Sequence, residues 1–477
     1  MALAPEPQTT AVRPRRRSTL AVLCAGMLMI ILDETIVNVA LASIQRDLGF
    51  SPSGLAWVVN AYLIAFGGLL LFAGRIGDLI GRRTVFVAGL SVFTAASVLC
   101  ALAASPGQLV AGRFLQGVGG ALTSSVILGM IVALYPEPGK QARAIGAFSF
   151  SAAAGGSIGL VAGGAIAQSL SWHWIFVVNV PIGIGAIAFA LRTIEHQAGL
   201  GLRAGADVPG ALLATGGLML GVSAIVGTAD HGWSSARTLL TAGSAVLLIA
   251  GFVARQATAV TPLLPLRLFR SQSLSAGNLV LALMVGGIFS FQFLTALYLQ
   301  RVLGYEPGAV GLAIAPVAVG IAVLSMFVFP RLVARMPGRS LLVTGLALLA
   351  AGLGLLARLP VEGRYVSDVL PALVLLGIGF GLAMPALTSL TMADVPEREA
   401  GVASGLYNTS QQVSGALGLA IAASLSAART DRAAGDGLAS ASALTEGYTL
   451  AYMFSAGLVT AALLAAWFLF KPAPDPT

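Results

Sequence analysis

Two adjacent carboxylates, Asp33 and Glu34, stand in a run that is otherwise uncharged and mostly apolar from Leu20 to Leu41. A carboxyl group in apolar surroundings can take a proton from one side and release it when hydration changes or a cation arrives. If the run is helical, the two side chains project about 100° apart, and Glu34 shares a face with Asn38. Both acids are therefore candidates for carrying a proton or contacting a cation, and we expect them to have different tasks.

Arg113 is a third charge in an apolar stretch, RFLQGVGGA, at residues 113–121. An arginine at the centre of a membrane helix costs about 2.5 to 3.5 kcal/mol, so such a residue usually has a partner or a task. Two alternatives are open. Arg113 can pair with one of the two acids, or its side chain can extend to the nearby end of the span.

These charges need helices that hold them in apolar surroundings, and the composition predicts such helices. Hydrophobic residues make up 57% of the 477 residues and charged residues 10%, against roughly 25% charged in soluble domains. Apolar runs repeatedly reach the roughly 20 residues that cross a hydrocarbon core. We predict an all-α integral membrane protein with about 14 spans, which begin near Ser18, Ser53, Thr84, Gln108, Ala144, Trp174, Val208, Thr238, Leu274, Gly308, Leu341, Val369, Gly401 and Tyr448.

The distribution of basic residues predicts the orientation. An even number of spans puts both termini on one side, and 19 of the 27 Lys and Arg residues fall in segments on that side. Because cytoplasmic segments are enriched in Lys and Arg, we expect both termini in the cytoplasm. The net charge of +8 then reflects topology and does not indicate nucleic-acid binding. The first apolar run is too long for a signal peptide and is expected to remain as the first helix.

Cysteine, tryptophan and histidine positions predict packing and not chemistry. Cys24 and Cys100 lie in apolar runs and are expected to be packed side chains. Five tryptophans near span ends are expected at membrane interfaces: Trp57, Trp172, Trp174, Trp233 and Trp467. Three histidines fall in predicted loops without metal-ligand spacing: His173, His196 and His231. No ATP-binding motif occurs, and we expect neither an ATP-driven protein nor an enzyme.

The segment GRIGDLIGRR, residues 74–83, is predicted to link the second and third spans on the cytoplasmic side. Asp78 can meet a helix N-terminus or an arginine, while Arg82 and Arg83 can hold the inner interface as a charge-paired latch. The alternative is a basic loop that only sets the topology.

Two segments resemble each other: RAIGAFSFSAAAGGSIGLVAGGAI from Arg143 and REAGVASGLYNTSQQVSGALGLAI from Arg398. Each starts at Arg-x-x-Gly and enters a span rich in small residues, which let helices approach closely. Related spans in two halves are typical of transporters built from repeats, although shared composition alone also explains the likeness.

Together these motifs resemble the major facilitator superfamily. The pattern comprises Asp33-x-Thr35…Asn38 in the first span, Gly74-x-x-x-Asp78-x-x-Gly81-Arg82-Arg83, Arg113-x-x-Gln116-Gly117, and the Gly-rich fifth span. The predicted spans and the segment LDETIVNVAL are similar to its fourteen-helix drug/proton antiporter branch. The match covers essentially the whole chain after residue 18.

The resemblance implies the fold and the domains. It implies two six-helix bundles with two helices inserted between them, and alternating access around a cavity at the membrane midplane. The expected divisions are a cytoplasmic tail over 1–17, a first bundle over 18–195, inserted helices over 196–272, a second bundle over 273–470 and a tail over 471–477.

The resemblance also implies roles for individual residues. Asp33 matches the family's acidic position and is expected to be essential for proton coupling together with Arg113, while Glu34 is expected to tune coupling or contact a cation. The latch residues are then the gating motif. The family's antiporter motif falls on Gly155, Gly159, Gly163 and Gly164.

Two positions depart from the family's pattern. Leu160 stands where the antiporter motif typically has a proline, so the sequence does not decide whether the fifth span is kinked or whether transport is strict antiport. Ala42 stands where the first-helix segment typically ends in a proline.

Polar and aromatic residues of the predicted spans are expected to line a roomy, mostly apolar substrate cavity. They are Asn38, Asn60, Tyr62, Gln116, Phe291, Gln292, Phe293, Asn408, Gln411 and Gln412. The alternative for each is a hydrogen bond that holds two helices together.

The function expected from these patterns is export of hydrophobic or monocationic drugs or antibiotics across the bacterial cell membrane in exchange for protons. No other predicted span contains an Asp or Glu near its centre, and this absence disfavours a dication as substrate. The alternatives are gradient-coupled export of one endogenous metabolite or self-made antibiotic, and a sensor that transports nothing. We expect a monomer in a lipid bilayer that binds a hydrophobic small molecule, with no cofactor besides the proton gradient, no metal and no nucleic acid.

Overall fold

The structure is a computed structural model, and it describes residues 13–135, 137–195, 199–201, 205–232, 234–333, 335–395 and 400–470. Within these ranges the chain forms helices joined by turns and loops, and no β-strand occurs. The prediction of an all-helical membrane fold is confirmed. His196, Trp233, Arg398 and residues 1–12 and 471–477 of the predicted tails lie outside the described residues.

The first half of the chain contains seven labelled α-helices. They are α1 Arg13–Leu48, α2 Trp57–Ile80, α3 Arg82–Ala101, α4 Pro106–Leu134, α5 Pro138–Ser169, α6 Trp174–Val177 and α7 Asn179–Thr193, with the short turn η1 Gly54–Ala56 before α2. Proline at the start of α4 and α5 suits the first helical turn because its missing N–H has no helical partner there. At α4, Ser105 also caps the helix by accepting from the Gln108 N–H.

The second half continues with two inserted helices and a further bundle. The elements are α8 Val208–His231, α9 Ala236–Thr258, η3 Leu266–Arg270, α10 Gln272–Arg301, α11 Pro307–Val323, η4 Leu324–Val328, α12 Phe329–Val333, α13 Gly338–Leu356, η5 Tyr365–Val369, α14 Leu370–Met392, α15 Ala400–Gly435 and α16 Ser440–Leu469.

Twelve helices in the described ranges are long and apolar enough to cross a membrane. Two other predicted spans also have helical counterparts. One is α5, with 32 residues, and the other is the 17-residue apolar helix α11, which continues without interruption through η4 and α12. The count of fourteen spans stays a prediction.

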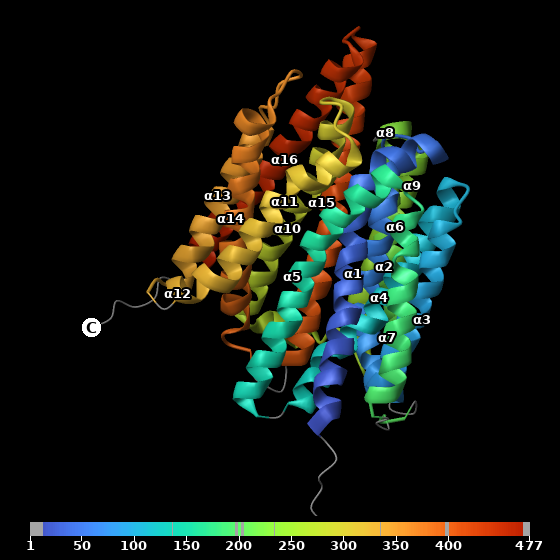
Figure 1. Cartoon of the computed structure of the whole chain (residues 1–477), viewed down its shortest axis with the longest axis vertical. Helices are drawn as coiled ribbons and strands as arrows, with labels where there is room; N and C mark the ends of the chain where they lie inside the picture. Colours follow the sequence, from blue (N-terminus) through green and yellow to red (C-terminus); the bar gives the residue numbers. More distant parts are fainter. Residues whose placement is uncertain are drawn as a thin grey trace, which may run out of the picture.

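The helices form two bundles that stand side by side (Figure 1). In the first bundle α1 packs on α5 and α7, α2 on α4, and α3 on α4 and α7. In the second bundle α10 packs on α15 and α16, α13 on α14 and α16, and α11 on α14. Helix α5 also packs on α11 of the second bundle, and α15 packs on α2 of the first.

This packing is similar in the two halves. Helix α5 packs closely on α1, and α15 packs closely on α10, where a Cβ on Gly415 would lie 3.0 Å from the Phe289 ring. The two helices therefore occupy related places, each touching its own bundle and the other one. They are also the helices whose sequences resemble each other, so repeated packing supports the internal repeat.

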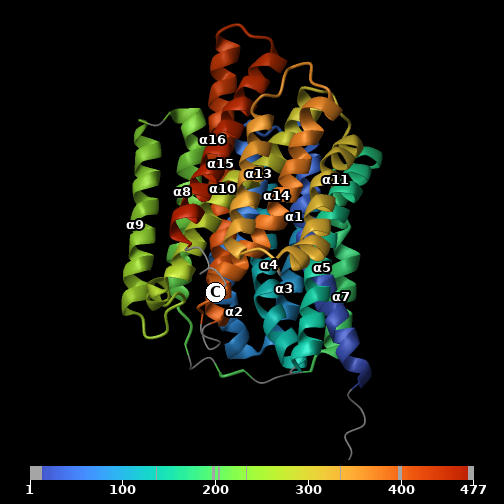
Figure 2. The same ribbon diagram turned by 90° about the vertical axis from the view of Figure 1, so that its left-hand side faces the viewer.

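The hairpin of α8 and α9 lies outside the two bundles, with α9 outermost (Figure 2). Helix α8 packs on both α2 and α15. At α2, a Cβ on Gly68 would lie 2.8 Å from Thr215 Oγ1, and at α15 the Ser424 hydroxyl donates to the Ile225 carbonyl at 3.1 Å. The hairpin thus contacts both bundles along one seam.

Asp207 joins the two helices of this hairpin at their base. It caps α8 by accepting from the Gly210 N–H at 3.0 Å, and it also accepts from Gln256 at 2.8 Å and pairs with Arg255, both of α9. Burial by itself would raise the pKa of Asp207, but the hydrogen bonds from Arg255, Gln256 and Gly210 outweigh it and hold the pKa below its usual 3.8.

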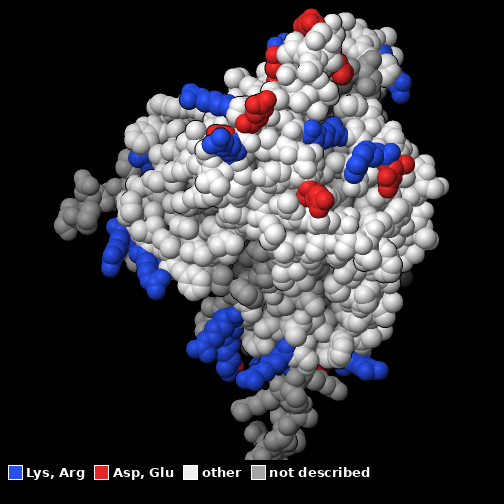
Figure 3. Space-filling view, turned by 45° about the horizontal axis from the view of Figure 1, so that its top comes forward, with Lys and Arg blue, Asp and Glu red and all other residues white. Residues whose placement is uncertain are grey.

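Charged side chains separate along the long axis. Figure 3 shows mostly Lys and Arg along the lower rim, near the start of α1, and acidic side chains mixed with basic ones on the upper face. The terminal face, defined as the end where α1 begins at Arg13 and α16 ends at Leu469, carries the basic residues that predict a cytoplasmic location.

Trp172 is a correction to the predicted interfacial belt. Its side chain is 1% exposed, stacks on His173 and donates from Nε1 to Asp47 at 2.8 Å. The indole therefore joins the end of α1 to the loop before α6. Trp174 and Trp467, which are 49% and 53% exposed, fit the expected belt.

Candidate functional site

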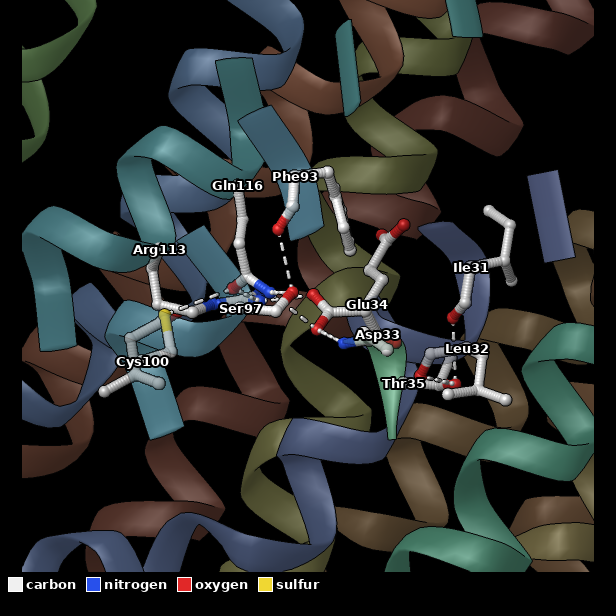
Figure 4. Close-up of polar contacts among 12 residues, drawn as sticks. Ile31, Leu32, Asp33, Glu34, Thr35, Phe93, Ser97, Cys100, Arg113 and Gln116 are labelled. Atoms are coloured by element: carbon white, nitrogen blue, oxygen red, sulfur yellow. Dashed lines mark hydrogen bonds and ion pairs between the residues drawn. The ribbon is translucent and has the colours of Figure 1, made fainter. Parts of the chain in front are cut away.

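Asp33 lies at the centre of a buried polar network formed by α1, α3, α4 and α7. Its side chain is fully buried, and its Oδ2 atom pairs with Arg113. Its Oδ1 atom accepts hydrogen bonds from Gln116 at 3.0 Å and from Asn179 at 2.7 Å. Figure 4 shows the carboxylate directed toward Arg113 and Gln116. Three side-chain donors thus satisfy one carboxylate away from water.

Arg113 has its hydrogen-bond donors directed inward. Its Nε donates to the Val58 carbonyl of α2 at 2.9 Å, and its guanidinium lies 4.5 Å from the centre of the Tyr62 ring. The side chain is fully buried. The sequence left two alternatives for Arg113, pairing with an acid or extension to the end of the span. In the structure it pairs with Asp33 and does not extend to the end of the span.

Gln116 extends the network and does not line the cavity as expected. Its amide donates to Ser97 at 2.9 Å, and its carbonyl accepts from Arg113 at 2.8 Å and from the Cys100 thiol at 3.4 Å. Both ends of the side chain are therefore used within the first bundle. The reason is its position one turn after Arg113 on α4, which directs both side chains toward Asp33.

Two further cavity predictions are also corrected. Tyr62 lies against Arg113 and is fully buried. Asn60 is fully buried as well, and neither of its amide atoms has a hydrogen-bond partner among the described residues. Because they are two residues apart on a helix, Asn60 and Tyr62 lie on nearly opposite sides of α2. Neither lines the cavity, to which this helix contributes Val59, Phe66 and Leu70.

A cavity of about 370 Å³ lies between the two bundles, large enough for a small organic ligand. Seven of the ten predicted cavity residues line it: Asn38, Phe291, Gln292, Phe293, Asn408, Gln411 and Gln412. Further phenylalanines, Phe66, Phe289 and Phe380, add to an apolar wall. Amides from α1, α10 and α15 provide hydrogen-bonding points, and Asn38 approaches Gln292 at 3.5 Å across the bundles.

Glu34 is the one ionisable side chain among the described residues that line this cavity. Its carboxylate has no hydrogen-bond or ion-pair partner in the described part of the chain. In Figure 4 it points away from the Asp33 carboxylate. The two adjacent acids thus face different surroundings, as their separation on a helix predicts.

The gating motif forms the turn between α2 and α3. Gly81 ends α2 with φ of +97°, a conformation that favours glycine. Asp78 pairs with Arg82 at 3.4 Å, and Arg82 also donates to the Gly129 carbonyl of α4 at 2.9 Å. Both side chains of the pair are partly exposed.

The remaining motif residues also contact the first bundle. Arg83 donates to the Leu191 carbonyl of α7 at 2.7 Å, and the Asp78 carbonyl accepts from the Leu200 N–H of the following loop at 2.9 Å. Gly74 is less crowded, since an added Cβ would lie 3.9 Å from Ser125. These contacts join α2, α3, α4 and α7, and a role in gating stays a prediction.

Three of the four antiporter-motif glycines face α1: Gly155, Gly159 and Gly163. A Cβ on Gly159 would lie 2.8 Å from the Leu32 carbonyl, so the two backbones are in close contact. Gly164 faces α11 instead, 2.6 Å from the Pro307 carbonyl by the same measure. Helix α5 runs uninterrupted through Leu160.

Residues 155–159, GGSIG, match the G-x-S-x-G pattern of the nucleophile elbow in α/β-hydrolases. They lie inside a helix and not at the strand-to-helix turn that such an elbow requires.

Comparisons with known proteins agree with this architecture. The sequence model of the Major Facilitator Superfamily matches residues 23–419. This chain belongs to the major facilitator superfamily. It is 37% identical to the puromycin resistance protein pur8 of Streptomyces alboniger over 96% of this chain and 92% of that protein. It is also 37% identical to the cephamycin export protein CmcT of Amycolatopsis lactamdurans, over 85% and 84% of the two chains.

A solved structure shares the major facilitator fold. It is the crystal structure of a bacterial homolog of the human lysosomal transporter Spinster, with a TM-score of 0.70, 18% identity, and 97% of this chain and 100% of that one covered. The superfamily resemblance is confirmed. The protein is a multi-pass transporter of the bacterial cell membrane and not an enzyme, related to antibiotic resistance and export proteins.

Sequence reasoning missed two members of the polar network, Asn179 and Ser97. Ser97 donates to the Phe93 carbonyl at 2.8 Å and accepts from Gln116. Neither residue carries a charge, and both lie in ordinary apolar spans. The segment Asn179-Val180-Pro181 offers a signal, because a polar residue before a proline in a span marks an interrupted helix.

Proposed function

We propose that this transporter exports hydrophobic or monocationic antibiotics or drugs from the cytoplasm in exchange for protons. The observation that carries the proposal is the separation of the two acids. Asp33 is held in a buried ion pair in the first bundle, whereas Glu34 lines the cavity between the bundles. We assign proton exchange to Asp33, because protonation there would release the ion pair with Arg113, and contact with a substrate cation to Glu34, because its side chain lines the cavity.

The position of the cavity supports alternating access, which is part of this proposal. The cavity lies between two bundles, and its lining comes from α1, α2, α4 and α5 on one side and α10, α11, α14 and α15 on the other. If the bundles rock against each other, the same residues face each side of the membrane in turn. The proton gradient is the proposed energy source, because each proton that enters across 100 mV releases about 2.3 kcal/mol. We propose a monomer, since the cavity is formed by one chain.

A narrower function is the second candidate. The puromycin resistance protein and the cephamycin export protein are each named for a single compound. By analogy, this chain would export one antibiotic or one metabolite made by its own cell. Transport of many unrelated cations favours the first candidate, and transport of one compound favours the second.

Ethidium efflux from energised cells tests the proposal, with and without a protonophore. We expect wild-type efflux to be sensitive to the protonophore. Asp33→Asn is expected to lose driven efflux by at least about tenfold, because a protonatable group is gone. Glu34→Gln is expected to weaken ethidium transport while sparing a neutral substrate, because the cavity loses its negative charge. Full, protonophore-sensitive efflux by Asp33→Asn at equal membrane abundance would remove Asp33 from proton coupling.

A further inference from the structure

Asn179 is a fully buried side chain that uses its donor group and leaves its acceptor unused within the described part of the chain. Its Nδ2 donates to Asp33 Oδ1 at 2.7 Å. Its own carbonyl oxygen is buried and has no hydrogen-bond partner among the described residues. A buried oxygen without a partner costs free energy, so its retention calls for an explanation such as a task in another state of the protein.

The other two side chains that hold Asp33 have no acceptor to spare. The Arg113 guanidinium can only donate. Gln116 has a carbonyl oxygen, but this atom already accepts from Arg113 at 2.8 Å and from the Cys100 thiol at 3.4 Å. Among the three described side-chain partners of Asp33, Asn179 is therefore the one with a free acceptor.

This difference decides which partner can serve a protonated Asp33. An ionised carboxylate only accepts hydrogen bonds, whereas a protonated carboxyl group also has an O–H that needs an acceptor. We infer that Asn179 is a positioning residue that stabilises Asp33 in both of its protonation states, by rotating its amide when the proton arrives. The inference rests on the proposed proton exchange at Asp33.

The rotation conserves the hydrogen-bond count. Before uptake, the Asn179 N–H donates to Asp33 Oδ1. On uptake, a hydronium ion loses a proton to that Oδ1 atom, so one of its O–H bonds breaks and a new O–H bond forms on Asp33. A turn of the amide by about 180° brings the Asn179 carbonyl oxygen to accept the new hydrogen. On release, the O–H bond on Asp33 breaks, the proton passes to a water molecule, and the amide turns back. No other covalent bond changes.

The helical path continues through Val178, whose backbone is right-handed helical, but one backbone hydrogen bond is missing beside Asn179. Asn179 is the first residue of α7, and Val178 separates it from α6. Pro181 follows two residues later, and its ring excludes the normal hydrogen bond to the carbonyl of Val177. The missing hydrogen bond loosens the backbone beside Asn179, so that its side chain can turn without a movement of the whole helix.

The test uses purified protein in liposomes with ethidium as the transported probe. Transport driven by an imposed pH gradient is compared with ethidium exchange in the absence of a gradient. Asn179→Leu keeps the size of the side chain and removes both hydrogen-bonding atoms, while Asn179→Gln and Asn179→Thr can still donate and accept. Asn278→Leu is the matched control, because Asn278 is a buried asparagine of α10 that donates to Leu274 and also has a carbonyl oxygen without a partner.

We expect Asn179→Leu to lose driven transport about tenfold more than exchange, as fits the loss of one buried hydrogen bond. Recovery by Asn179→Gln or Asn179→Thr, and an unchanged ratio for Asn278→Leu, complete the expected pattern. Equal losses of driven transport and exchange would assign Asn179 a structural role and overturn the inference, as would a wild-type ratio in Asn179→Leu. If Asp33→Asn is itself still driven by the pH gradient, the proposed proton exchange fails first, and the inference fails with it.

Discussion

Asp33 and Arg113 each offset part of the cost of burying the other's charge. The pair is fully buried, and the neighbouring Gln116 and Asn179 satisfy the second carboxylate oxygen. A buried ion pair is not in itself strongly stabilising, but the loss of one partner leaves an uncompensated charge. The stability of the first bundle therefore depends on keeping or removing both charges together.

Arg113→Met is expected to destabilise the protein by about 3–5 kcal/mol, because Asp33 stays buried without its cation. The double variant Asp33→Leu/Arg113→Met is expected to recover most of this loss, because it removes both charges. Unfolding of the purified variants in detergent measures the two effects. A double variant no more stable than Arg113→Met would show that charge compensation is not what Arg113 contributes.

The contact between α1 and α5 helps to fix the position of the helix that carries Asp33 and Glu34. It depends on glycine at positions where the two backbones nearly touch, and Gly159 is the tightest, next to Thr35 and the Leu32 carbonyl. No space for a side chain remains there. If α1 and α5 separated or tilted, both acids would move.

Gly159→Ala is expected to destabilise the protein by about 1–3 kcal/mol through overpacking and to reduce transport. Gly185→Ala in α7 is the control, because an added Cβ there would meet no atom within 4 Å. Thermal unfolding and ethidium efflux are measured for both variants. Wild-type behaviour of Gly159→Ala would show that α1 and α5 are not held at this distance by the glycine.

The base of the α8–α9 hairpin depends on the charge of Asp207. Because its pKa is lowered in the folded protein, Asp207 contributes stability above its usual value of 3.8, and the contribution is lost as the pH falls through the lower folded value. At pH 7 the contribution is fully present. Asp207→Asn removes it at every pH.

For Asp207→Asn we expect amide hydrogen exchange at pH 7 to rise roughly tenfold at the start of α8 and the end of α9, because charge-assisted hydrogen bonds are lost. Glu137→Gln is the control, since Glu137 pairs with Lys140 on the exposed surface. Exchange is measured by mass spectrometry. Equal, small changes in the two variants would show that the charge of Asp207 does not hold the base of the α8–α9 hairpin together.

At the scale of the molecule, the bundles meet at the end opposite the terminal face. Gln168 of α5 donates to Glu306 at the start of α11, and Gln300 of α10 donates to the Val39 carbonyl of α1 at 2.9 Å. Under the proposed alternating access these contacts separate when the cavity opens to that side.

A disulfide between Gln168→Cys and Glu306→Cys, with Cys24 and Cys100 replaced by serine, is expected to abolish efflux, and reduction is expected to restore it. The control pair, Ser290→Cys and Ser455→Cys, joins α10 to α16 within one bundle, where the two hydroxyls are 2.8 Å apart. Efflux is compared before and after reduction. Undiminished efflux by the cross-linked Gln168–Glu306 pair would rule out separation of the bundles at this point.

Hydropathy and composition were sufficient to predict an all-helical membrane protein, because spanning a bilayer requires long apolar runs whatever their packing. Motif spacing was sufficient to identify the superfamily and to single out Asp33, Glu34 and Arg113. The angle between neighbouring residues on a helix also predicted different surroundings for the two acids. These are local properties of the chain.

Partners and faces, by contrast, depend on contacts between distant segments. Arg113 could not be assigned to Asp33 from the sequence, because 80 residues separate them. Gln116 and Tyr62 are polar residues in spans, like Gln292, but they face the interior of the first bundle, whereas Gln292 faces the cavity. Asn179 reaches Asp33 only because α7 packs on α1. The packing of all the helices together decides which side of a helix meets a neighbour and which side meets the cavity. The sequence of a single span does not determine it.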